Sequence, residues 1–420
     1  MLEREPHVGG RIRTIRAHGG TLNTGAAFLA SFYRETLRIC EEIGLPLVEP
    51  LIHPSRSHDK RHMVTPGGTF PFGPSSPSAF ARFPPVPPAQ KVRLLATIAW
   101  LLLGTRLHIA DVGSLARHDR GDADRWARRV IGDDACDYLV RPAIEPFFYA
   151  GADEVSAAVA MALLRHAARW RLVTPRDGMG ALCDRLARET TVVARARAVS
   201  VHRRVGDFVV QTPERAVATR SVILAGTAPD MLSLDPPIDA GDIADMRAVR
   251  YVPCIVVLFG YRRELDIPVP SLTVGGPGRH PLVGFTALRT GGAPGAVPSG
   301  MEVVSVLTMG WRSEELAHAG DAEIAGAVMD EVAALGVELP APDWTTIVRR
   351  REATVVPAAG GLTRVARCAA RPRRGVQLAG DWLAGCSTVE GAVRTGLHAA
   401  DAVAADLAQV REHGVGRRPS

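Results

Sequence analysis

A carboxylate followed by the start of a helix, near the C-terminal end of the chain, can bind an anionic or electron-rich ligand. The apolar segment 376–379 predicts a short strand that ends just before Asp381. A loop of small residues leads into a predicted helix over 390–400, with Ser387 or Thr388 as its N-cap. The carboxylate can accept a ligand hydroxyl, while the free N–H groups and dipole of the helix face an anion or a ring edge. The pattern predicts a dinucleotide site, and its alternative is an ordinary strand–turn–helix with a tight packing face.

The first residues of the chain carry a second group with the same chemistry. Glu3 stands six positions before Gly9, and Gly10 and Arg11 follow directly. A carboxylate at a strand end can accept ribose hydroxyls, and paired glycines let the backbone pass under a pyrophosphate. The guanidinium of Arg11 can add charge-assisted hydrogen bonds.

Together, these segments resemble the flavin amine oxidase superfamily, which includes protoporphyrinogen oxidases and phytoene-type desaturases. The two specific matches are Glu3 with Gly9–Arg11, and the pair Leu378–Asp381 and Val389–Gly396; segments 174–182 and 355–361 match more loosely. The resemblance implies an FAD cofactor, with its ribityl or pyrophosphate part at Asp381 and its pyrimidine edge at the N–H groups of 389–392. It places the adenine near Val193 or Val199. The cofactor-binding residues that it implies are Glu3, Gly9, Gly10, Arg11, Val193, Val199, Gly380, Asp381, Val389, Glu390, Gly391 and Ala392.

In that family, a strand, a Gly-x-Gly-x-x-Gly turn and a helix precede the strand that ends in Glu. Met1 stands only two residues before Glu3, so we expect this first βα unit to be missing from the chain. A start codon placed too late, a truncated chain and a relative that has lost FAD each explain this, and the first is favoured. The codons upstream of Met1 distinguish these explanations.

The predicted fold is α/β with an α+β substrate lobe: a Rossmann-like FAD-binding domain interwoven with a mixed-sheet and helical substrate domain. An amphipathic helix is expected over 27–43, and helices are expected throughout 89–171, the last of them over 153–171. The expected segments are 1–45, 172–232 and 355–412 for the FAD-binding domain, 46–171 and 233–354 for the substrate domain, and 413–420 as a disordered tail.

Composition excludes several other classes of protein. Hydrophobic residues make up 46% of the 420 residues and charged residues 22%, as in globular proteins. The net charge of +6 comes from scattered arginines without an aromatic platform, which argues against nucleic-acid binding. Six widely spaced cysteines without a secretory signal indicate a reducing cytoplasm. Segment 92–104 is too short to span a bilayer and predicts a buried or interfacial helix, so peripheral membrane contact stays open.

The expected reaction is oxidation or dehydrogenation of a hydrophobic small molecule, of polyprenoid or porphyrinogen type, by hydride transfer to the flavin. The amine oxidase branch places a lysine near the flavin, but the chain has lysine only at positions 60 and 91. A flavin amine oxidase is therefore the weaker alternative, and a cofactor-free structural or partner subunit is another. No metal site is expected at the histidines of 53–62, no catalytic residue stands out, and the oligomeric state is left open.

Overall fold

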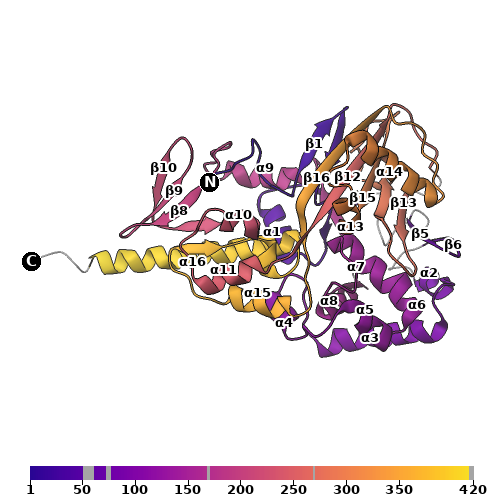
Figure 1. Cartoon of the computed structure of the whole chain (residues 1–420), viewed down its shortest axis with the longest axis horizontal. Helices are drawn as coiled ribbons and strands as arrows, with labels where there is room; N and C mark the ends of the chain where they lie inside the picture. Colours follow the sequence, from indigo (N-terminus) through magenta and orange to yellow (C-terminus); the bar gives the residue numbers. More distant parts are fainter. Residues whose placement is uncertain (51–60, 72–76, 168–170, 268–269, 416–420) are drawn as a thin grey trace, which may run out of the picture.

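The computed structural model describes residues 1–50, 61–71, 77–167, 171–267 and 270–415. Three parts lie side by side in Figure 1: a large sheet at the upper right, a helical lobe at the lower right, and smaller sheets with a long helix at the left. The chain passes repeatedly between them, so segments far apart in sequence become neighbours.

A seven-stranded sheet forms the first part. β13 runs parallel to β5, and the other neighbouring strands pair antiparallel. The strands in spatial order are β16 (Trp344–Val355), β12 (Tyr251–Tyr261), β15 (Glu302–Thr308), β14 (Leu282–Ala287), β13 (Ser271–Val274), β5 (Arg61–Thr65) and β6 (Gly68–Pro71).

The continuous apolar run of β12 reflects burial of both of its faces. Ile255, Val257 and Phe259 face one side and pack with helix α14 (Asp321–Ala334) in one hydrophobic cluster. The alternate residues Cys254 and Val256 belong to another cluster on the opposite face. Because side chains alternate along a strand, one face of β12 packs in the hydrophobic core and the other face borders a cavity.

The helical lobe fills most of residues 77–167. Its packing joins α3 with α8 and α5 with α8, and Figure 1 shows it below the sheet. Its helices are α2 (Pro77–Arg82), α3 (Pro88–Gly104), α4 (Val112–Ala116), α5 (Ala123–Val130), α6 (Asp133–Ala135), the π-helical turn η1 (Cys136–Val140), α7 (Arg141–Phe148) and α8 (Ala157–Ala167).

The third part contains short sheets and the long α16 (Val389–Val415), which runs toward the C-terminus in Figure 1. β11 (Val222–Leu224) and β17 (Val376–Leu378) pair in parallel, and an isolated parallel bridge joins Leu2 to Val193. No strand of the described residues links these two parallel pairs. The remaining elements are β1 (Thr14–Ala17), β2 (Gly20–Asn23), β3 (Leu29–Ala30), α1 (Arg34–Glu42), β4 (Leu47–Val48), β7 (Leu172–Pro175), α9 (Gly180–Arg188), β8 (Ser200–Arg203), β9 (Phe208–Gln211), β10 (Ala216–Thr219), α10 (Ala228–Leu232), α11 (Ala240–Arg247), α12 (Leu288–Gly291), α13 (Gly310–Glu315), α15 (Gly361–Ala369) and η2 (Asp381–Ala384).

The fold class agrees with the sequence, and two helices differ. The helix expected over 27–43 begins only at Arg34, because Leu29 and Ala30 pair with β7 as strand β3. Its expected end is confirmed, since Gly44 follows with φ +61°. The helix expected over 153–171 starts at Ala157, because the amides of the preceding turn bond elsewhere, as Ser156 does to the carbonyl of Pro357.

Part of the tail expected to be disordered is helical, since α16 continues to Val415. The histidines at 53 and 58 lie outside the described residues. No described helix is both long enough and apolar enough to cross a bilayer.

Candidate functional site

One cavity of about 2570 Å³ runs between the parts of the fold. The residues that the sequence proposed for a cofactor line it, except Val199, Glu390 and Gly391. Segments from both ends of the chain therefore meet around one space. Residues of both parallel pairs also line it: Leu2 and Val193 of the isolated bridge, and Val222–Leu224 of β11.

A partly buried ion pair joins the two motifs. Nη2 of Arg11 lies 2.5 Å from Oδ1 of Asp381, which also accepts a bond from the amide of Trp382. Nη1 of Arg11 donates to the carbonyl of Ala353 at 3.3 Å and to Oγ of Ser387 at 3.5 Å. Burial works to lower the pKa of Arg11, but the charge of Asp381 and its hydrogen bond outweigh burial and raise that pKa. The guanidinium therefore stays charged and orients the carboxylate.

The start of α16 presents free backbone donors. Oγ1 of Thr388 accepts from the amide of Gly391 at 2.9 Å, and its carbonyl accepts from the amide of Ala392, which confirms Thr388 as the N-cap. The amides of Val389 and Glu390 have no acceptor among the described residues. Two N–H groups at the positive end of a long helix dipole thus remain for a ligand.

Glu390 points its side chain away from this opening. Its two oxygens accept from the amides of Glu35 and Thr36 at 3.1 and 2.9 Å, and from the hydroxyl of Thr36 at 2.8 Å. The carboxylate therefore caps the N-terminus of α1, and only the backbone N–H of Glu390 is free for a cofactor. Gly391 has a packing role as well, since a Cβ there would lie 2.7 Å from the Cβ of Ala384.

At the N-terminus, the structure places Glu3 beside Val193. The amide of Glu3 donates to the carbonyl of Val193 at 3.0 Å, and the amide of Ala196 donates to the carbonyl of Glu3 at 2.7 Å. Val199 instead directly precedes β8, is 42% exposed and does not line the cavity. Of the two valines proposed near the adenine, only Val193 is therefore next to Glu3.

Backbone crossings explain two of the glycines in the N-terminal motif and the loop after it. Gly9 has φ +104°, and a Cβ there would meet the carbonyl oxygen of Ile12 at 2.4 Å. At Gly25, a Cβ would lie 1.8 Å from the carbonyl oxygen of Arg11. Side chains at these positions would push the loops apart, so glycine keeps the segment that carries Arg11 next to the loop after β2.

Three cavity residues were not predicted from the sequence. Arg350 donates from Nε to the carbonyl of Thr24 and from Nη1 to that of Gly10, while its buried Nη2 has no partner among the described residues. Tyr149 has a left-handed φ of 53°, unusual for a bulky residue. Cys254 comes from the cavity face of β12. The run of arginines at 349–351 and the apolar context of the other two carry no local signal of function.

Electrostatics sets the protonation of these groups. Burial lowers the pKa of Arg350, and the charges of Arg13 and Arg11 lower it further. Burial raises the pKa of the Cys254 thiol to about 12 and also raises that of the Tyr149 phenol. At neutral pH, therefore, Tyr149 and Cys254 carry their protons.

The other end of the cavity is apolar. Phe80, Leu94, Ile98 and Leu164 line it from the helical lobe, and Phe285 and Leu307 line it from the large sheet. An extended apolar molecule can be buried here and reach the loops that carry Gly10 and Thr24.

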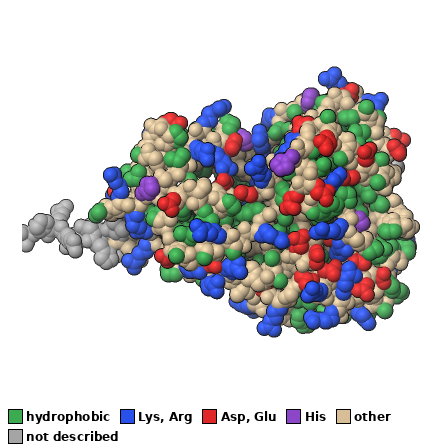
Figure 2. Space-filling model, in the orientation of Figure 1, with side chains coloured by type: hydrophobic (Ala, Val, Ile, Leu, Met, Phe, Trp, Pro, Cys, Tyr) green, Lys and Arg blue, Asp and Glu red, His purple; other side chains and the backbone are tan. Residues whose placement is uncertain are grey.

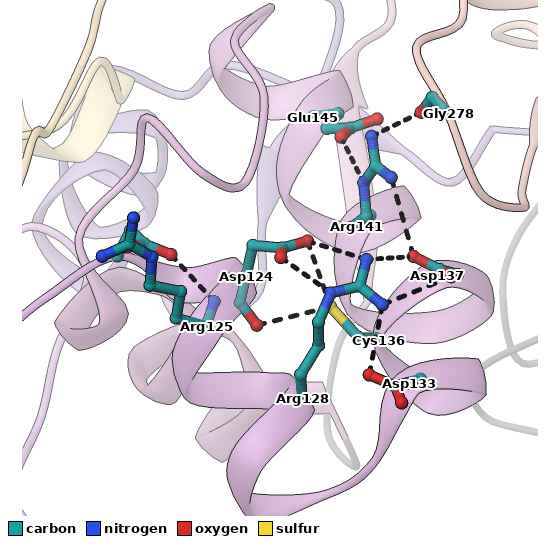
Figure 3. Close-up of polar contacts among 10 residues, drawn as sticks. Asp124, Arg125, Arg128, Asp133, Cys136, Asp137, Arg141, Glu145 and Gly278 are labelled. Atoms are coloured by element: carbon teal, nitrogen blue, oxygen red, sulfur yellow. Dashed lines mark hydrogen bonds and ion pairs between the residues drawn. The ribbon is translucent and has the colours of Figure 1, made fainter.

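Asp124, Cys136 and Asp137 have metal-ligand spacing, but arginine already occupies their carboxylates. Arg128 donates to Asp124 at 2.8 Å and to Asp137 at 2.6 Å, as Figure 3 shows. Burial, followed by the charge of Asp124, raises the pKa of Cys136 to about 12, which disfavours the thiolate that a metal needs. We interpret the cluster as an ion-pair network, which Arg141 extends by donating to the carbonyl of Gly278 at 2.6 Å.

The residues present fit a flavin nucleotide. The free N–H groups of α16 suit an electron-rich ring edge, and the Asp381 carboxylate suits ribityl or ribose hydroxyls. Gly9 and Gly25 hold the segment of Arg11 next to the loop after β2, at the border of the cavity. The fold and the site therefore define a flavin-dependent oxidoreductase.

The chain belongs to the family of flavin-containing amine oxidoreductases, whose sequence profile matches residues 1–404. No curated protein matches significantly. One similar solved structure is a "putative protoporphyrinogen oxidase" from Exiguobacterium sp. 255-15, at 17% identity and a TM-score of 0.71 over 98% of this chain and 92% of that one. Another is cyclohexylamine oxidase from Brevibacterium oxydans IH-35A, at 15% identity and 0.73 over 97% and 93%. A third is the fatty acid isomerase from P. acnes that produces CLA, at 16% identity and 0.67 over 94% and 90%. At these identities, the neighbours establish the fold.

Proposed function

We propose that the protein oxidises or dehydrogenates a hydrophobic small molecule with FAD as its cofactor. The observation that carries this proposal is the single cavity that joins Asp381 and the start of α16 to an apolar pocket in the helical lobe. One end suits the cofactor and the other suits a large apolar substrate, such as a polyprenoid or a porphyrinogen.

In this proposal, the chain holds FAD through residues from three segments. Glu3 would accept the adenosine ribose hydroxyls, Asp381 would accept a ribityl hydroxyl while Arg11 orients it, and the amides of Val389 and Glu390 would face the pyrimidine edge. Held there, FAD would supply the acceptor for a hydride equivalent from the substrate.

The remaining work of the chain is positioning and charge. Arg350 bridges the carbonyls of Gly10 and Thr24, so its cation stands beside the loops that would hold the flavin. A cation there favours negative charge on its neighbour. Tyr149 and Cys254 are protonated neighbours of Arg350. The thiol of Cys254 donates to the carbonyl of Ile255 at 3.6 Å, so the phenol of Tyr149 is the group that can donate a hydrogen bond into the cavity. The apolar walls exclude water from the substrate.

A flavin amine oxidase is the second candidate, and family membership favours it. The position of lysine argues against it. Lys91 lies on α3 in the helical lobe, where its Nζ donates to the carbonyl of Ala81 at 2.8 Å, and position 60 is outside the described residues. No described lysine stands at the loops of Gly10 or Asp381.

The first test measures the cofactor. The 420-residue chain and a form extended by in-frame upstream codons are purified, and the released flavin is identified by mass spectrometry. We expect about one FAD per chain in a form that binds it, and a loss in Asp381→Asn but not in the exposed Asp321→Asn. If neither form takes up FAD, the proposal is wrong and a cofactor-free subunit is the better assignment.

The second test identifies the substrate class. Loaded enzyme is mixed anaerobically with apolar polyprenoids or porphyrinogens, or with putrescine and cyclohexylamine, and bleaching of the flavin is followed. We expect bleaching by an apolar compound. Bleaching by the amines alone would assign an amine oxidase instead.

A further inference from the structure

Helix α3 presents an apolar face to solvent. Leu103 is 91% exposed and Val92 66%, and Leu95, Trp100 and Leu102 are also exposed. These side chains, with the exposed Ala96 and Ala99, define the α3 face. Exposed positions of a soluble helix are normally polar. On α3, the sole exposed polar or charged side chain between Pro88 and Gly104 is Arg93.

The other side of α3 is packed, so its apolar face is not a misplaced core. Leu94, Thr97 and Leu101 are buried and recur at helical spacing. Apolar side chains therefore lie on both the buried and the exposed face of α3, although only the buried face packs against described residues. Contiguous exposed apolar surface of this kind marks an interaction site.

The segment that carries the α3 face is basic, although Asp134 of α6 accepts a hydrogen bond from Gln90, in the first turn of α3, at 2.8 Å. Residues 62–110 contain Arg82, Lys91, Arg93 and Arg106 and no aspartate or glutamate. Arg82, Arg93 and Arg106 are exposed. The lower edge of Figure 2, where α3 lies, shows hydrophobic and Lys or Arg side chains. An apolar helix face with flanking cations and an exposed tryptophan matches the headgroup region of an anionic bilayer.

The cavity reaches the same place. Val92, Leu95 and Lys91 of α3 and Ala79 and Phe80 of α2 line it, so the α3 face borders the apolar end of the cavity. A bilayer on that face would be next to the entrance for an apolar molecule.

We propose that the α3 face docks on an anionic lipid bilayer and inserts its apolar side chains at the headgroup boundary. A second copy of the chain fits less well. A two-fold pairing of this face would bring the cations of one copy against those of the other. Residues 62–110 contain no acid to compensate, and the neighbouring Asp134 of α6 already accepts a hydrogen bond from Gln90. The proposal concerns binding and does not rest on the reaction; the route of the substrate from the lipid rests on the proposed function.

The experiment is flotation of the full chain with phosphatidylcholine vesicles, with and without phosphatidylglycerol. We expect binding that requires phosphatidylglycerol and weakens with salt. The double variant Leu95→Glu/Leu103→Glu should reduce partitioning at least tenfold, because it places two carboxylates at the interface. Loss of one cation should reduce partitioning about fivefold, and Arg93→Glu should reduce it further because it also adds a negative charge.

Matched controls lie on the β8–β9 turn, which is not part of the α3 face. Val205 is 105% exposed and Arg204 is also exposed, so Val205→Glu and Arg204→Glu repeat the chemistry elsewhere and should leave binding unchanged. Circular dichroism shows that each variant is folded. No binding of the wild type to anionic vesicles, equal binding to neutral ones, or equal losses in the controls would overturn the proposal. A dimer in sedimentation that Leu95→Glu/Leu103→Glu dissociates, without vesicle binding, would assign the face to a second copy. Because neither flavin nor substrate is added, failure here leaves the proposed function standing.

Discussion

The ion pair between Arg11 and Asp381 links the first and last parts of the cofactor site, and a double-mutant cycle tests its contribution. The variants are Arg11→Met, Asp381→Asn and the two combined. Two unit charges about 4 Å apart interact by about 4 kcal/mol at an effective dielectric constant near 20. The Arg11 side chain is 29% exposed and that of Asp381 7%, so solvent screens part of this energy. We therefore expect a coupling energy of about 2–3 kcal/mol.

Each single variant should lose more stability than its lost contacts alone account for, because the remaining partner is left unpaired. Arg11→Met leaves a buried carboxylate whose remaining hydrogen-bond donor, among the residues that the structure describes, is the amide of Trp382. Breaking a buried ion pair costs about 3–5 kcal/mol. Partial exposure of Arg11 places this variant near the lower end, at about 3 kcal/mol. The double variant removes both charges, so its loss of unfolding free energy should be smaller than the sum of the losses of the two single variants.

The assay is urea denaturation of the flavin-free protein, followed by tryptophan fluorescence. The chain has six tryptophans, and Trp382, next to Asp381, is fully buried, so its exposure on unfolding contributes to the change in emission. Additive effects, within about 0.5 kcal/mol, would refute the assignment of Arg11 as the partner that orients Asp381. The flavin content of the same variants then separates stability from cofactor binding.

Three other changes test the rest of the site. Gly25→Ala should reduce both flavin content and stability, because its Cβ would lie 1.8 Å from the carbonyl oxygen of Arg11. The control Gly326→Ala in α14 meets no neighbouring atom and should be neutral or stabilise the protein by up to about 1 kcal/mol. Thermal melts and flavin content compare the two variants, and equal behaviour would contradict the close backbone approach at Gly25. Arg350→Met should lower the midpoint potential of the flavin, because it removes a cation beside the loops that would hold the flavin. Dye-coupled redox titration measures the shift, and an unchanged potential would place Arg350 away from the flavin. Burial lowers the pKa of His166 from 6.5 to about 4. Between these two pH values, His166 is protonated in the unfolded chain and neutral in the folded chain. Stability should therefore fall as pH drops from about 6.5 to 4, by at most about 3 kcal/mol, and His166→Phe should flatten that decline in urea titrations; parallel curves would refute it.

Local patterns predicted several elements because their signals are local. The periodicity of 89–171 predicted helices such as α3, and the apolar segment 376–379 predicted strand β17. Residue type and position alone limited the N-cap to Ser387 or Thr388, and the structure selects Thr388. Such features depend on side-chain spacing within one segment.

Other features depend on partners far along the chain. Leu29 and Ala30 form a strand because β7, more than a hundred residues later, offers its backbone. The helix that follows begins at Arg34, where a carboxylate from α16 satisfies its first amides. A segment that looks helical by pattern was therefore divided by tertiary contacts.

The sequence by itself determined which chemistry this protein carries: the carboxylates, paired glycines and helix start of a flavin site. Their identity and spacing are local properties, so one chain sufficed to recognise them. Only the tertiary structure decided how they are used. It paired Arg11 with Asp381, turned Glu390 from the cofactor to the cap of α1, and placed Arg350 at the loop of Gly10. It also left one side of α3 uncovered next to the cavity. The physical reason is that ion pairs, caps and exposed faces depend on which distant segments become neighbours, and this is a property of packing.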